Sequence, residues 1–154
     1  MNITSASFRE KSAWVILGAI LVVFVPYFTF VFRLFAAGQL VAGAVLGLFI
    51  GATIWMILLT AGFHIALSLF SRADNPDERD RAIELKSFRV AYAIMAITFF
   101  CAIGAMVVLA LPSANPSGVR WLAPVFVSQV FFLCFVLAEI GKYLTQVICH
   151  RRGS

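Results

Sequence analysis

One stretch, DNPDERDRAIELKSFR (residues 74–89), divides an otherwise apolar chain into two halves. The chain has 154 residues, of which 62% are hydrophobic and only 12% are charged, and its mean hydropathy is +0.99. A composition this apolar excludes an ordinary soluble globular domain. The polar stretch is therefore expected to connect segments that lie in a membrane.

Two long apolar runs precede this stretch and two follow it. A hydrocarbon core of about 30 Å needs about 20 helical residues, and each run is long enough. Helices also satisfy every backbone N–H and C=O group inside lipid. The sequence therefore predicts one domain, an all-α membrane protein with four transmembrane helices in two antiparallel hairpins. The predicted spans are residues 13–35, 41–70, 90–111 and 121–148, and the predicted cytoplasmic connection is 71–89.

The basic residues predict the orientation of these helices. If the N-terminus is inside, ten of the 12 Lys and Arg residues are cytoplasmic and only Arg33 and Arg120 are outside. Such a bias in short loops sets topology. Both termini are thus expected in the cytoplasm. This rule also accounts for the net charge of +5, so no nucleic-acid partner is expected.

The polar stretch carries signals for the start of a helix. Asn75 is a good N-cap, Pro76 suits the first helical position, and Glu78 lies three residues after the cap. The next helix breaker is Gly104. The third helix is therefore predicted to begin near Pro76, extended into the cytoplasm, and to continue into the membrane.

Acidic and basic residues balance between Arg72 and Arg89, with five of each. A neutral segment is not a polybasic lipid-binding patch. It is either a solvated helix face whose charges pair with one another, or a docking site for another chain. The candidate docking residues are Asp77, Glu78, Arg79, Asp80 and Arg81.

The second apolar run contains a row of small residues, Gly43, Gly47 and Gly51. Residues four apart share one face of a helix, and glycine lets another backbone approach closely. The row is either the groove that accepts another helix of the same chain or the contact face of a homodimer.

A second candidate site is a set of ionisable residues expected near the cytoplasmic side: His64, Arg89, Glu139 and Lys142. A carboxylate in a membrane is costly unless it is paired, so Glu139 should contact Lys142, Arg89 or His64. The set is either a structural clamp between helices or a proton-coupled or ligand site open to the cytoplasm.

Catalytic and metal-binding motifs such as HExxH, GxSxG or a phosphate-cradling loop are absent from the sequence. No cofactor or metal is expected, and the sequence favours a non-enzymatic role. The leading hypothesis is an interaction, scaffold or regulatory protein whose partners are the lipid bilayer and a protein at the cytoplasmic helix or a second copy at the glycine row. The alternative is a small proton-coupled transporter or channel that uses Glu139 and His64.

The motif Asp77-Glu78-Arg79-Asp80-Arg81, with Glu139-x-x-Lys142 in the last apolar run, resembles a group of small bacterial integral membrane proteins. The resemblance covers about a quarter of the chain. It implies four helices, a DERDR-type central cytoplasmic motif and a location in a bacterial inner (cell) membrane, and it implies no activity.

Overall fold

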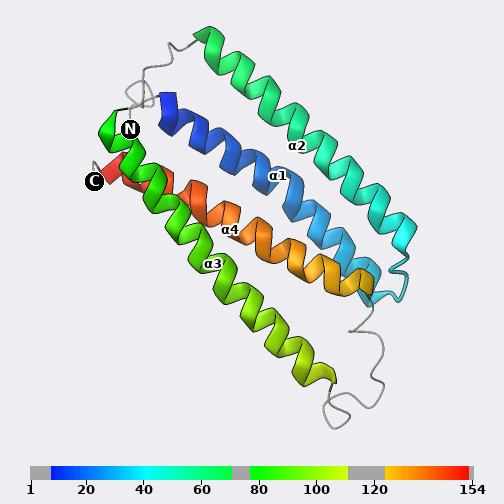
Figure 1. The fold of residues 1–154 in the computed structure, drawn as a ribbon. Coiled ribbons are helices and arrows are strands. Elements are labelled where there is room, and N and C mark those ends of the chain that lie inside the picture. Colours follow the sequence, from blue (N-terminus) through cyan, green and yellow to red (C-terminus); the bar gives the residue numbers. More distant parts are fainter. Residues whose placement is uncertain (1–7, 71–76, 111–123, 153–154) are drawn as a thin grey trace.

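The structure, a computed structural model, describes residues 8–70, 77–110 and 124–152 (Figure 1). Within these residues the chain forms four helices: α1 (Phe8–Ala36), α2 (Ala42–Phe70), α3 (Glu78–Ala110) and α4 (Pro124–Arg152). All four are long and apolar enough to cross a membrane. The prediction of an all-α protein with four candidate membrane spans is thus confirmed.

Helix α3 begins at Glu78. Asp77 is its N-cap, because its Oδ1 accepts a hydrogen bond from the Asp80 amide at 2.7 Å and its carbonyl accepts one from the Arg81 amide at 3.2 Å. A short side chain that satisfies a free amide of the first turn starts a helix at the next residue. Asn75 and Pro76 lie outside the described residues.

The short connection between α1 and α2 is closed by a glycine. The Gln39 amide donates to the Leu34 carbonyl at 2.9 Å, and the Gly38 amide donates to the Phe35 carbonyl at 3.0 Å. This pair of bonds is a Schellman motif, which requires a left-handed backbone at its central residue. Gly38 has a φ of 72°, a conformation that glycine adopts without strain.

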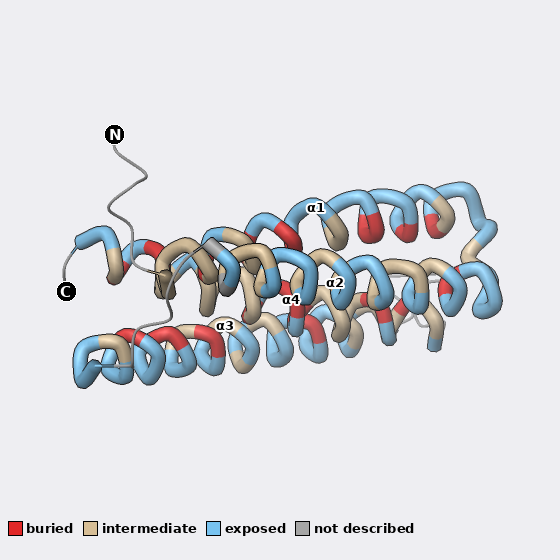
Figure 2. Tube along the Cα trace, turned by 90° about the horizontal axis from the view of Figure 1, so that it is seen from above, coloured by how far each residue is buried: buried red, intermediate tan, exposed pale blue. Residues whose placement is uncertain are grey.

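The four helices pack in a row in the order α2, α1, α4, α3 (Figure 1). The principal contacts join α1 to α2, α1 to α4 and α4 to α3. In the most apolar 18-residue window of α1 and of α4, 33% of residues are buried, against 6% in α2 and none in α3. Figure 2 likewise shows buried residues recurring along α1, whereas most of α2 is exposed. Thus α1 and α4 are the central pair, and α2 and α3 are edge helices.

Aromatic rings from three helices meet around Phe132 of α4. Its ring centroid lies 5.5 Å from Phe24 and 5.6 Å from Phe28, both on α1. It also lies 5.1 Å from Phe49 of α2. Edge-to-face and tilted pairs at such distances are favourable beyond the area they bury. This cluster joins the core of α1 and α4 to the edge helix α2.

One buried hydrogen bond crosses the central pair. The Tyr27 hydroxyl donates to Oε1 of Gln129 at 2.5 Å, and both residues are buried. A polar group in a lipid environment has no water to bond, so two such groups partner each other across the helix interface. The bond fixes the relative position of α1 and α4.

The contact between α3 and α4 depends on a glycine. A Cβ atom added at Gly141 would overlap Cδ1 of Ile94, whereas one added at Gly104 would meet nothing within 4 Å. Ile94 of α3 therefore fills the space that the missing side chain of Gly141 leaves on α4.

Candidate functional site

A cavity of about 310 Å³ lies where α1 and α3 begin and α4 ends. We call it the terminal cavity. Its volume is at the lower end of the range for small-ligand sites, which is about 300 to 1,000 Å³. It is lined by residues of these three helices: Phe8, Arg9, Ser12, Ala13, Ile16, Asp80, Ile83, Glu84, Phe88, Lys142, Tyr143, Gln146 and His150.

An ion pair joins the two helix starts on this cavity. Arg9 Nε of α1 lies 3.1 Å from Asp80 Oδ2 of α3, and the two side chains are 34% and 21% exposed. A partly exposed pair contributes little to stability, about 1 kcal/mol or less. However, α1 and α3 are not neighbours in the row, so the pair is a direct link between them.

A second ion pair ties the start of α1 to the end of α4. Arg151 Nε donates to Glu10 Oε1 at 3.3 Å. The Arg151 guanidinium also lies over the ring of Trp14, 4.9 Å from its centroid. Both contacts hold the first turns of α1 against the last turn of α4, beside the terminal cavity.

Lys142 is the most enclosed cation of the cavity, with a side chain that is 14% exposed. Its ammonium lies 4.6 Å from the ring centroid of Phe88 and 4.9 Å from that of Tyr143. It also lies 3.5 Å from Oε2 of Glu139. This distance is long for a charge-assisted hydrogen bond, which is about 2.7 to 2.9 Å. The ammonium is therefore held both by the two aromatic faces and by a long contact with the carboxylate.

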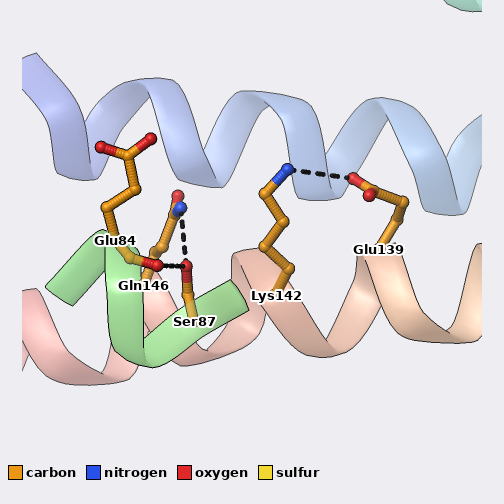
Figure 3. Close-up of polar contacts among 5 residues, drawn as sticks. All are labelled: Glu84, Ser87, Glu139, Lys142 and Gln146. Atoms are coloured by element: carbon orange, nitrogen blue, oxygen red, sulfur yellow. Dashed lines mark hydrogen bonds and ion pairs between the residues drawn. The ribbon is translucent and has the colours of Figure 1, made fainter. Parts of the chain in front are cut away.

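Hydrogen bonds join α3 and α4 on the same cavity (Figure 3). Gln146 Nε2 donates to Ser87 Oγ at 3.1 Å, and Ser87 Oγ donates to the Glu84 carbonyl at 2.7 Å. Ser87 is fully buried. Figure 3 shows the side chains of Glu84, Gln146 and Lys142 extending toward α1, and all three line the cavity. The carboxylate of Glu84 makes no ion pair within the described residues.

The structure brings together two members of the predicted polar set. Lys142 and Glu139 form an ion pair, as their spacing on one helix allows. Arg89 is exposed on α3 and is not part of the cavity lining. His64 lies on the edge helix α2 and does not line the terminal cavity. In the part of the chain that the structure describes, no hydrogen bond or ion pair joins His64 or Arg89 to the other two.

Several cavity residues were not identified from the sequence. Lys142, Gln146 and His150 repeat every four residues, which places them on one face of α4. Asp80 and Glu84 have the same spacing on α3. The spacing in these two rows could have identified the candidate residues from the sequence. The sequence does not show, however, that the two rows face each other.

The candidate docking residues fall into two groups. Asp77 caps α3 and Asp80 pairs with Arg9, so both take part in the fold. The other three are exposed: Glu78, Arg79 and Arg81. Across the described ranges no ion pair joins Arg81 to Asp77 or Glu78, so the pairing expected within this segment is not observed.

The glycine row borders a second hollow, an apolar groove of about 930 Å³ between α1 and α2. We call it the glycine groove. Added Cβ atoms at Gly43, Gly47 and Gly51 would meet nothing within 4 Å. Pro26 of α1 and Trp55 of α2 also line it. Within residues 8–70, 77–110 and 124–152, no helix of this chain fills the groove.

Metal binding has no support in the described residues, where no group of three His, Cys, Asp or Glu side chains could hold an ion. The described cysteines Cys101, Cys134 and Cys149 are free thiols, and the last two are buried. The terminal cavity has charged and hydrogen-bonding side chains beside apolar ones.

Comparisons with known proteins found no matching family model, no matching curated protein and no matching solved structure. We therefore infer the function from the chemistry of the terminal cavity and the shape of the glycine groove.

Proposed function

We propose that the chain is a multi-pass protein of a bacterial inner membrane, with both termini and residues 74–89 in the cytoplasm. The four helices then form two antiparallel hairpins, α1 with α2 and α3 with α4. The length of α3 supports this arrangement: 33 residues span about 50 Å at 1.5 Å per residue. Because the hydrocarbon core is about 30 Å thick, about 20 Å of α3 extends beyond it. The charged first turns of α3 would form that extension.

Single-cysteine labelling tests this orientation. A cysteine at Arg79 should react with a membrane-impermeant maleimide only from the cytoplasmic side, and one at Gln39 only from the opposite side. A protein that lacks its three native cysteines is the control. Labelling of both positions from the same side would refute the proposed topology.

Within that membrane we propose that the protein acts by interaction, as a scaffold, regulator or accessory subunit that associates with a second copy of itself. The observation that carries this proposal is the glycine groove between α1 and the edge helix α2. The row Gly43, Gly47 and Gly51 is open, although such rows normally serve close helix packing. A second copy of α2 has the same row and can approach it in a symmetric, self-complementary contact.

The oligomeric state in lipid nanodiscs tests this proposal. Wild-type protein should be dimeric, and Gly47→Ile should weaken association at least tenfold, a loss of about 1.4 kcal/mol, because its side chain fills the contact face. The substitution meets open space in the monomer, so the helical content should not change. Gly18→Ile is the matched control, since Gly18 is also exposed with open space but lies outside the groove. A monomeric wild type would refute the proposal.

The exposed charges at the start of α3 support a second contact, with a protein partner in the cytoplasm. Reversing the charges of Glu78, Arg79 and Arg81 together should abolish capture of that partner. Asp77 should be left intact, because its removal would disturb the helix cap. Equal capture by the wild type and by the triple variant would argue against a docking role.

The transporter alternative has no specific observation in its favour. It needs His64 and Glu139 in one polar path, and no hydrogen bond or ion pair in the described residues joins His64 to Glu139.

A further inference from the structure

The terminal cavity lies at the level where lipid headgroups are expected. The helix α4 has 29 residues, about 44 Å by helical rise, so its ends pass beyond a hydrocarbon core of about 30 Å. Its charged residues all lie in its C-terminal half, from Glu139 to Arg152. The cavity also has apolar lining residues, among them Phe8 and Ile16. A recess with polar and apolar walls at this depth suits a molecule with both kinds of surface.

The charges of the cavity disfavour the binding of a ligand with a net negative charge. Each of its two permanent cations already has a carboxylate, Asp80 for Arg9 and Glu139 for Lys142. Glu84 adds a negative charge without an ion pair in the described part of the chain. Glu84 is exposed, so the positively charged group of a ligand can reach its carboxylate. Lys142 can still bind an anionic group, because an ammonium has three donors and its one carboxylate contact is long, at 3.5 Å.

The aromatic residues decide which kind of cation fits. A quaternary ammonium is recognised by open aromatic faces. Here the rings of Phe88 and Tyr143 are already occupied by the ammonium of Lys142, at 4.6 and 4.9 Å. A primary ammonium instead needs hydrogen-bond acceptors. The Glu84 carboxylate provides them, as does the amide oxygen of Gln146, whose NH₂ group is used on Ser87.

We propose that the terminal cavity binds the headgroup of a zwitterionic phospholipid with a primary amine, of the phosphatidylethanolamine type. Lys142 binds the phosphodiester, and Glu84 and Gln146 bind the ammonium. The acyl chains leave along the apolar wall toward the membrane. This site is independent of the glycine groove and of self-association, and it gives the protein a preference for one class of lipid.

Lipid binding to the delipidated, detergent-purified protein, measured by native mass spectrometry, tests the site. The probes are phosphatidylethanolamine, phosphatidylcholine and phosphatidylglycerol with identical acyl chains. The wild type should bind phosphatidylethanolamine most tightly. Glu84→Gln should weaken that binding about tenfold or more, as expected for a lost hydrogen bond between charged groups, and leave phosphatidylcholine binding unchanged. Lys142→Met should weaken both, because both lipids have the phosphodiester.

Glu78→Gln is the matched control, because Glu78 is an exposed acid on the same helix outside the cavity lining. It should leave all three affinities unchanged. The proposal is overturned if the wild type binds phosphatidylglycerol or phosphatidylcholine as tightly as phosphatidylethanolamine, or if Glu84→Gln keeps the preference. Displacement of the lipid by soluble phosphoethanolamine at millimolar concentration would also overturn it, because the ligand would then be a free zwitterion.

Discussion

Because α3 and α4 approach closely at Gly141, we can predict how Gly141→Ala changes the free energy of unfolding. The new Cβ would overlap Cδ1 of Ile94, and it would lie 3.6 Å from Cγ1, an ordinary contact. Overpacking of this kind costs about 1 to 3 kcal/mol. Replacing glycine by alanine inside a helix gains about 1 kcal/mol. Gly141→Ala should therefore lower the free energy of unfolding by between about 0 and 2 kcal/mol.

A second substitution separates the two effects. Ile94→Val removes a terminal methyl group at the point of overlap and by itself should cost about 0.5 to 1.5 kcal/mol. In that background Gly141→Ala should stabilise the protein by about 1 kcal/mol, because only the helix propensity remains. The two sites should thus show a coupling energy of about 1 to 3 kcal/mol in a double-mutant cycle, the size of the overpacking term.

Unfolding by SDS in mixed micelles, followed by far-UV circular dichroism, measures these four free energies. Gly104→Ala is the control, because its Cβ meets nothing within 4 Å, and it should stabilise the protein in either background. If Gly141→Ala and Ile94→Val add within about 0.5 kcal/mol, the two residues do not share space. The packing of α3 on α4 described above would then be wrong.

Three further substitutions test other parts of the structure by the same unfolding measurement. Tyr27→Phe should cost about 0.6 to 1.7 kcal/mol, the range for hydrogen bonds between membrane helices, and no loss would refute the bond to Gln129. Lys142→Met should lower the free energy of unfolding by about 1 to 2 kcal/mol, because it removes two cation–π contacts and leaves Glu139 unpaired. Glu139→Gln removes only the ion pair, so a larger loss for Glu139→Gln than for Lys142→Met would show that the cation–π contacts do not stabilise the protein. Gly38→Ala should cost about 1 to 2 kcal/mol, because an alanine at a φ of 72° is strained, and a neutral result would exclude the turn.

The candidate site was only partly visible in the sequence. Lys142 was one of three partners expected for Glu139, with Arg89 and His64, and a spacing of three on one helix brings these two residues together. The partners Arg9 and Gln146 were missed, since their contacts with Asp80 and Ser87 cross between helices. No spacing along the chain specifies such contacts.

The sequence by itself determined that the chain forms four long apolar helices, because runs of this length can satisfy their backbone groups in lipid only as helices. Sequence signals in the charged stretch, residues 74–89, also predicted that a helix starts there, and α3 begins at Glu78. The tertiary structure alone decided the order α2, α1, α4, α3. Each membrane segment is apolar on all sides, so no hydrophobic stripe marks the face that packs against a neighbour. That choice depends on side-chain shape, such as the rings around Phe132 and the space at Gly141, which exists only when two helices meet.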